Sequence, residues 1–459
     1  MQILSLLLSI PLLIAPAGEK ESSVAPSTVQ SLADAFVESE LAPGIAIGVL
    51  DESGRIRTYC AGTLKVGGEQ PVTEDTIFEI GSITKVFTAT LAHLLEQRGE
   101  LSLSDSVGVH LPDEINVKVV DGNEMMLWHL ATHTSGLPRM PDNTNDNQPN
   151  PHLGYTNAQL YEFLEKTGPE RAPGQECVYS NIGIGLLGHI LELNQDASYE
   201  ELVQQHILKP LKMSRTRCTP RDSDASRVAT AHSGRQPASA WDVNGPMAGA
   251  GDLNSSLRDM MKFARANLSD LNTQLHRSMR ACQIPRVKGK SGGRVGLAWH
   301  VIGESSERII HHGGGTGGFR SFMAFMPDRG RAVVVLANST HDVGTLGRHI
   351  LAPDIVGIEQ LPLLVAIPTY QPRQPINHDE YVGSYRSDSD ARFVVENRNG
   401  ELFARLDKQN FFAFRPIGED LFLFDRANAQ LRFEHDAQGR VTTLILKQNG
   451  REIRYLREF

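Results

Sequence analysis

The sequence predicts an α+β protein, in which an antiparallel sheet flanked by helices carries an inserted all-helical lobe and is followed by a small antiparallel β-barrel. Strand-like runs lie in residues 44–60 and return in residues 295–338, and helical patterns fill most of the chain between them. A proline-rich segment comes next, and beyond it short strand-like runs alternate with turns. We therefore expect a first domain over residues 27–355, a linker over 356–376 and a barrel over 377–459.

Length and composition are typical of a soluble globular protein with more than one domain. The chain has 459 residues, which is long for a single core, and 40% of them are hydrophobic and 22% charged. The formal net charge is −9. Because binding to a phosphate backbone needs a basic face, we expect no nucleic-acid partner.

The N-terminal segment has the pattern of a secretory signal peptide. Residues 3–17 are strongly apolar, too few to span a bilayer comfortably, and they end in Ala15-Pro16-Ala17, a small-x-small cleavage pattern. No lysine or arginine precedes the apolar run, so a retained N-terminal anchor is the alternative. We expect a signal peptide over residues 1–17, an exported protein in the periplasm or outside the cell, and no stable membrane span.

Each element of the first domain has its own local signal. Residues 27–40 are amphipathic with a helical period, and the turn sequence at 51–54 separates two apolar runs. A broad apolar stripe after Ser82 predicts a helix that ends at Gly99. A helix over residues 251–268, with a capping-box-like start at Ser256, precedes strands at 295–303, 308–312, 321–326 and 332–338.

The predicted barrel consists of eight strand-like runs at a spacing typical of small antiparallel barrels. Asn399-Gly400 and Asn449-Gly450 are strong signals for hairpin turns between them. The runs are residues 381–386, 393–397, 402–406, 411–414, 421–424, 431–435, 441–447 and 453–456.

Ser82 and Lys85 form an S-x-x-K pattern at the start of a predicted helix. Residues three apart lie on one face of a helix, so the lysine is one turn from the serine. The free N–H groups at a helix N-terminus favour developing negative charge, and a neutral amine can take the proton of the serine hydroxyl. A capped helix with a solvent-facing lysine explains the pattern equally simply, so the rest of the chain must decide.

A second pattern, Tyr179-Ser180-Asn181, places a phenol and an amide on the same side of a tight loop. A phenol near an ammonium can relay protons, and an amide can hold a substrate carbonyl or N–H group. The simpler interpretation is an ordinary helix entry, with Asn181 as the cap and Tyr179 as a packing residue.

A third pattern, His312-Gly313-Gly314-Gly315, ends a predicted strand. Glycines let a substrate backbone lie close to the strand, and their N–H groups can form an oxyanion hole. A flexible hairpin with two surface histidines, His311 and His312, is the alternative.

In this chain order the three patterns resemble the signature of the serine β-lactamase and penicillin-binding protein superfamily, which is S-x-x-K, then Y-x-N, then K-T-G or H-x-G. The closer likeness is to its class C-like branch, which includes D-amino-acid peptidases, D-Ala-D-Ala carboxypeptidases and esterases. Residues 130–138 and 336–339 add to the similarity, which covers residues 27–345. The resemblance implies a β-lactamase/transpeptidase-like fold, and the tail resembles the lipocalin-like domain that some members carry.

The resemblance also implies a role for each residue of the motifs, with no metal and no cofactor. Ser82 is the acylated nucleophile, Lys85 and Tyr179 share the role of general base, Asn181 orients the substrate amide, His312 and Gly314 bind substrate, and the N–H groups of Ser82 and Gly315 form the oxyanion hole.

The expected function is that of a serine hydrolase acting through an acyl-enzyme on β-lactams, D-amino-acid peptides or esters. His312 and Gly313 stand where β-lactamases of this branch carry lysine and threonine, which weakens the binding of a substrate carboxylate unless the histidine is charged. A catalytically silent penicillin-binding or scaffold protein is the alternative. We expect the C-terminal domain to support homo-oligomerisation or to cover the cleft.

Overall fold

The computed structural model describes residues 26–144, 150–289, 292–357, 361, 376–398, 400–407, 411–424, 429–448 and 451–458. The predicted signal peptide, most of the predicted linker and the turn residues Asn399, Asn449 and Gly450 lie outside the described residues. Within the described ranges, no helix combines the length and apolar character that a membrane span requires.

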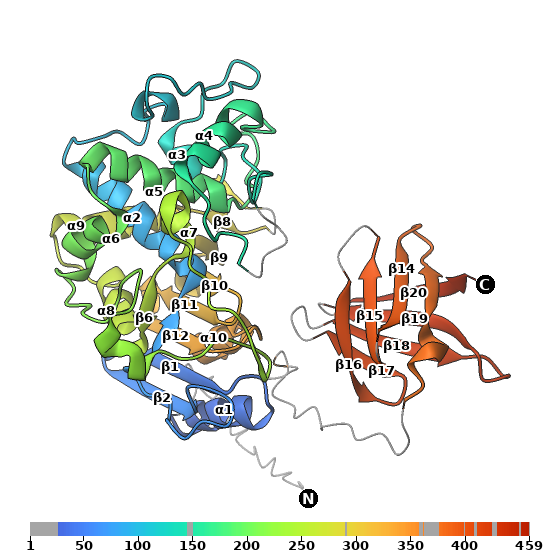
Figure 1. Ribbon diagram of the computed structural model, residues 1–459. Coiled ribbons are helices and arrows are strands. Elements are labelled where there is room, and N and C mark those ends of the chain that lie inside the picture. Colours follow the sequence, from blue (N-terminus) through green and yellow to red (C-terminus); the bar gives the residue numbers. More distant parts are fainter. Residues whose placement is uncertain are drawn as a thin grey trace, which may run out of the picture.

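The first domain is built on an antiparallel sheet in the order β2-β1-β12-β11-β10-β9-β8-β7 (Figure 1). Ile45 of β1 pairs with Ala337 of β12, so strands from the two ends of the domain lie side by side in the sheet. The bounds are β1 Gly44–Leu50, β2 Ile56–Gly62, β7 Val287–Lys288, β8 Arg294–Val295, β9 His300–Ile302, β10 Ile309–Gly315, β11 Arg320–Met326 and β12 Arg331–Ala337.

This sheet confirms the predicted strand–helix–strand order and differs from it in one strand. The run at 295–303 is interrupted by a turn, in which the Gly296 N–H donates a hydrogen bond of 2.9 Å to the carbonyl oxygen of Trp299 and Ala298 adopts a φ of 63°. The left-handed backbone at a non-glycine residue breaks the extended conformation, so β8 and β9 are separate short strands. In contrast, β10 continues through the glycines to Gly315.

Helices cover both faces of the sheet, which explains the continuous apolar sequence of β12. Val333 and Val335 pack with α1 and α10 in one core, whereas Val334 and Leu336 pack with α2 and α8 in the other. The helices are α1 Pro26–Glu38, α2 Thr84–Gln97, α3 Leu127–Ala131, α4 Asn157–Lys166, α5 Asn181–Gln195, α6 Tyr199–Val203, α7 Ala248–Gly251, α8 Leu257–Asn267, α9 Gln274–Cys282 and α10 Gly344–Leu351. Two small sheets pair β3 Ile77–Glu79 with β6 Asn254–Ser256 and β4 His232–Ser233 with β5 Gln236–Pro237.

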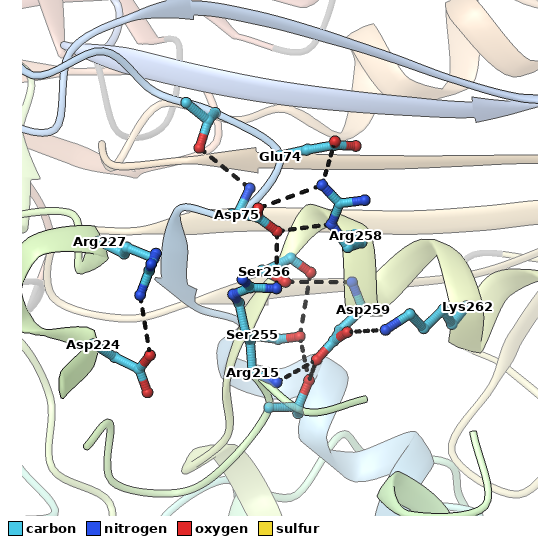
Figure 2. A network of polar contacts seen from close by, with 12 residues as sticks. Glu74, Asp75, Arg215, Asp224, Arg227, Ser255, Ser256, Arg258, Asp259 and Lys262 are labelled. Atoms are coloured by element: carbon cyan, nitrogen blue, oxygen red, sulfur yellow. Dashed lines mark hydrogen bonds and ion pairs between the residues drawn. The ribbon is translucent and has the colours of Figure 1, made fainter. Parts of the chain in front are cut away.

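A polar network fixes the start of α8 and the strand pair β3–β6 (Figure 2). Ser256 Oγ caps α8 by accepting a hydrogen bond of 3.3 Å from the Asp259 backbone N–H, so the helix begins six residues later than the predicted start at Gly251. The buried Asp259 carboxylate accepts hydrogen bonds of 2.7 Å from the Arg215 N–H and 2.7 Å from Lys262 Nζ. Since β3 leads directly into the turn that carries Ser82, this network supports the site described below.

The C-terminal domain is a closed eight-stranded antiparallel barrel, as predicted (Figure 1). Ser384 of the first strand pairs with Glu458 of the last, which closes the barrel. Its interior is lined by aromatic and aliphatic side chains such as Tyr385, Phe422 and Tyr455. The strands are β13 Gly383–Arg386, β14 Arg392–Arg398, β15 Glu401–Leu406, β16 Phe412–Gly418, β17 Leu421–Phe424, β18 Ala429–His435, β19 Val441–Gln448 and β20 Arg451–Glu458.

Candidate active site

Ser82 lies in a 3₁₀ turn, Gly81–Ile83, between β3 and α2. This turn packs against β10 so closely that side chains are excluded from both sides. A Cβ added to Gly81 would lie 2.8 Å from the Gly315 nitrogen, and one added to Gly314 would lie 2.0 Å from the Ile80 carbonyl oxygen. Glycine at these two positions therefore brings the Ser82 turn and the end of β10 into backbone contact.

Lys85 lies on the first turn of α2 and is completely buried. Its Nζ is 2.9 Å from Ser82 Oγ and 2.6 Å from the carbonyl oxygen of Ala250. Burial lowers the pKa of Lys85 well below its usual value, and the positive charge of Arg139 lowers the pKa further. The solvent-facing lysine of the simpler interpretation is therefore wrong, and a neutral amine has a lone pair available for the serine proton.

Tyr179 shares a hydrogen bond with Ser82, on the side of the serine that faces α5. Lys85 Nζ and the Arg139 guanidinium carbon each lie 5.1 Å from the centre of its ring. Burial raises the pKa of Tyr179 to about 12, although the hydrogen bond from Ser82 and the charge of Arg139 oppose this shift. The phenol is therefore protonated at neutral pH and can donate a proton.

Asn181 is the first residue of α5 but does not cap it. The cap is Ser180, whose Oγ accepts a hydrogen bond of 2.9 Å from the Gly183 N–H. The Asn181 amide nitrogen donates to Met140 Sδ at 3.3 Å, and its buried Oδ1 accepts no hydrogen bond from the described residues. This carbonyl oxygen is thus available to a substrate N–H group, and the interpretation of Asn181 as a helix cap is wrong.

His312 is 1% exposed and lies in β10, not in a mobile surface hairpin. Its Nδ1 is 2.7 Å from the carbonyl oxygen of Gly313, so Nδ1 carries the proton and Nε2 carries the lone pair. Burial lowers the pKa of His312 well below its usual value, and His300 and Lys85 lower it further. The imidazole is therefore neutral. Its Nε2 has no hydrogen-bond partner among the described residues and can accept a hydrogen bond from a ligand.

A cavity of about 560 Å³ brings the predicted site residues together from three segments of the chain. Lys85 lies directly behind Ser82 and does not line it. The lining includes the other six predicted residues, Ser82, Tyr179, Asn181, His312, Gly314 and Gly315.

The lining residues that were not predicted from the sequence include two, His300 and Arg139, whose side chains lie near Tyr179. His300 of β9 has its ring centre 5.2 Å from that of His312 and 6.2 Å from that of Tyr179. No motif marks it, because its place depends on the pairing of β9 with β10. Arg139 directly follows the stretch 130–138 that added to the resemblance, so extending that stretch by one residue would have found it.

Glu79, three residues before Ser82, is a buried carboxylic acid behind the cavity wall. Its Oε1 accepts a hydrogen bond of 2.9 Å from the N–H of Trp241, a cavity residue, and its Oε2 has no partner among the described residues. Burial raises the pKa of Glu79 to about 7. The proton bound by the folded state therefore contributes stability that is lost as the pH rises.

Between pH 4 and pH 8 we expect the wild type to lose about 2–3 kcal/mol of unfolding free energy that the Glu79→Gln variant keeps. Glutamine resembles the protonated acid but does not titrate, so its contribution does not change with pH. The wild-type contribution is complete below the unfolded-state value of 4.5 and is lost as the pH passes through about 7. Denaturant unfolding of both proteins across this range measures the difference. Glu124→Gln, an exposed position, is the control, and parallel pH dependences of wild type and Glu79→Gln would contradict the assignment.

Comparison with known proteins identifies the family: the family model described as Beta-lactamase matches residues 29–352. The chain belongs to the beta-lactamase family. The match ends before the barrel, which lies outside it. Membership supports a serine hydrolase at the level of the family and confirms the resemblance drawn from the three motifs.

Individual relatives and solved structures are similar to this chain over the same domain. The chain is 27% identical over 342 residues to a beta-lactamase of Escherichia coli, covering 67% of this chain and 86% of the relative. It is 29% identical over 335 residues to the D-alanyl-D-alanine-carboxypeptidase/endopeptidase AmpH of Escherichia coli, covering 69% of this chain and 85% of that relative. A class C beta-lactamase structure from Rhodobacter sphaeroides superposes with a TM-score of 0.59 at 28% identity, covering 68% of this chain and 94% of that one. A beta-lactamase/D-alanine carboxypeptidase structure from Pseudomonas syringae has the same fold, with a TM-score of 0.60 at 24% identity. The superposition covers 75% of this chain and 99% of that one.

Proposed function

We propose that this protein hydrolyses D-amino-acid peptides or esters through an acyl-enzyme on Ser82. The contact of 2.9 Å between Ser82 Oγ and the buried amine of Lys85 is the observation that carries the proposal. A lysine held neutral by burial can accept the serine proton at neutral pH, which an exposed lysine cannot do.

In the proposed acylation step Lys85 Nζ takes the proton of Ser82 while Oγ attacks the substrate carbonyl. The N–H groups of Ser82 and Gly315 donate to the oxyanion, and the Asn181 carbonyl oxygen accepts the N–H of the substrate's acyl amide. When the intermediate collapses, the phenol of Tyr179 gives its proton to the leaving oxygen or nitrogen, and the proton on Lys85 restores the phenol. Water then repeats the sequence on the acyl-enzyme and releases the acid.

Esters, and peptides whose leaving group carries no carboxylate, are favoured over β-lactams because His312 is neutral. Its Nε2 offers a lone pair where a lysine would offer positive charge, so it suits a hydroxyl or N–H group of the substrate better than a carboxylate. β-Lactam hydrolysis is the second candidate, because several relatives are named beta-lactamases. The predicted signal peptide, export and homo-oligomerisation through the barrel stay predictions.

The test is to offer the purified protein a D-alanyl-D-alanine peptide with an amidated C-terminus, an aryl ester of an N-acyl-D-alanine, a chromogenic cephalosporin and a fluorescent penicillin. We expect turnover of the peptide or the ester, together with slow labelling by the penicillin. Rapid turnover of the cephalosporin alone would establish a β-lactamase instead. If no substrate is cleaved and no label is bound, the silent scaffold protein is the correct interpretation.

We expect Tyr179→Phe to lower kcat/KM by about 100-fold for the peptide, since a protonated amine must leave, and by about 10-fold for the aryl ester, whose leaving group needs little help. The ratio between the two substrates measures proton donation directly. Tyr59→Phe, on the outer strand β2, is the control. An equal loss on both substrates would mean that Tyr179 has no role in leaving-group protonation.

A further inference from the structure

Arg139 is a charged, exposed side chain that lines the cavity. Its guanidinium forms no ion pair and no hydrogen bond with the described residues, and it stands over the ring of Tyr179 at 5.1 Å. A guanidinium presents a fork of donors that matches a carboxylate in geometry and charge. From these observations we infer that Arg139 selects substrates whose acyl portion carries an anionic group such as a carboxylate. This inference rests on the proposed acyl-enzyme function and adds the substrate class.

The other polar groups of the cavity leave this role to Arg139. Of the remaining charged lining residues, Arg320 donates through Nη1 to the carbonyl oxygens of Thr316 at 3.1 Å and Phe319 at 2.9 Å, and Asp342 is negative. The lining histidines His152, His300 and His312 all have pKa values lowered chiefly by burial, so they are neutral at neutral pH. These histidines therefore offer an anion no charge, and Nη1 of Arg320 is already engaged by two carbonyl oxygens.

The position of Arg139 fixes which part of the substrate carries the charge. The Arg139 carbonyl oxygen accepts a hydrogen bond of 2.9 Å from the Asn181 N–H, so the two residues lie at the same edge of the cavity. In the proposed mechanism Asn181 holds the amide of the acyl portion. A carboxylate bound by Arg139 thus belongs to the acyl portion and not to the leaving group, which faces the neutral histidines.

Two pairs of aryl esters of N-acyl-D-alanine test this. In the first pair the acyl chain is glutaryl or its uncharged carboxamide, with the same phenol as leaving group. In the second pair the acyl chain is acetyl and the leaving group is 3-carboxyphenol or 3-carbamoylphenol. For the wild type we expect kcat/KM to favour the glutaryl ester by about 10-fold, the size of one charge-assisted hydrogen bond that is partly screened by solvent. We expect no preference in the second pair.

Arg139→Gln is expected to bring the ratio of kcat/KM between the two esters of the first pair to about one, and Arg139→Glu to reverse the preference. The control is Arg221→Gln, at an exposed arginine outside the cavity, which should keep the wild-type ratio. Arg139 also lowers the pKa of Lys85, so its replacement can change the rate for every ester alike. The ratio between the two esters of a pair is therefore the quantity that tests selection. A loss of rate that is equal for all four esters, or a changed ratio only in the second pair, would overturn the inference.

A binding measurement separates this inference from the proposed mechanism. If no ester is hydrolysed in a Ser82-dependent way, the mechanism fails, yet calorimetric titration of the Ser82→Ala protein with the first pair still measures selection. We expect about 10-fold tighter binding of the glutaryl ester, lost in Ser82→Ala/Arg139→Gln. Equal affinities for the two esters would reject the role of Arg139 whatever the chemistry.

Discussion

Replacing Ser82 by alanine is expected to remove both covalent labelling and turnover, with kcat/KM lower by about 10⁴-fold or more. The hydroxyl is the only group of the proposed mechanism that forms a bond to the substrate, so no neighbouring residue replaces it. Intact-protein mass spectrometry after incubation with a penicillin shows the adduct in the wild type and its absence in the variant. Ser104→Ala, at an exposed serine, should label normally. An adduct that persists in Ser82→Ala would place the nucleophile elsewhere.

Replacing Lys85 by methionine should have the next largest effect, again about 10⁴-fold on kcat/KM, because the serine loses the group that accepts its proton. Methionine has a similar length and removes a buried amine, but it also removes the hydrogen bond to the Ala250 carbonyl oxygen, so we expect the free energy of unfolding to change by no more than about 1–3 kcal/mol. Denaturant unfolding beside the kinetics therefore separates loss of chemistry from loss of structure. Lys209→Met, at an exposed lysine, is the matched control. An active Lys85→Met enzyme would assign the base to another residue.

The same lysine sets the expected pH dependence. The amine must be neutral to act, so kcat/KM should fall as the pH drops through the pKa of Lys85, and burial places that pKa well below the usual value for lysine. The residual activity of Lys85→Met should lack this acidic limb. Retention of the limb in the variant would mean that a different group titrates.

The elements found from the sequence are those whose signal is local. β1 and residues 332–337 of β12 are apolar because both faces of the sheet are covered, and the eight barrel strands alternate with turn residues. Ser82 and Lys85 followed from helical spacing, which the structure keeps. These signals depend on the nearest residues alone.

The rest depends on tertiary contacts that a pattern does not contain. The break between β8 and β9 comes from the backbone of Ala298, and His300 reaches the cavity only through strand pairing. The tautomer of His312 is set by its distance to Gly313, and this decides between a cation and a lone pair. Such features bear on the choice of substrate more than on the reaction. The sequence motifs therefore predicted a reaction class but not the substrate.

The pairing of β1 with β12 has a consequence for biosynthesis. β1 ends at Leu50, whereas its partner β12 ends at Ala337, and the helical lobe with most of the cavity lies between them in the chain. The growing polypeptide has therefore released Ser82 and its lysine long before the strand that completes the sheet emerges. A long sequence separation between paired strands slows folding, and Gly315 of the proposed oxyanion hole is also synthesised late. We therefore expect the proposed nucleophile to stay inactive in the nascent chain until the domain is nearly complete.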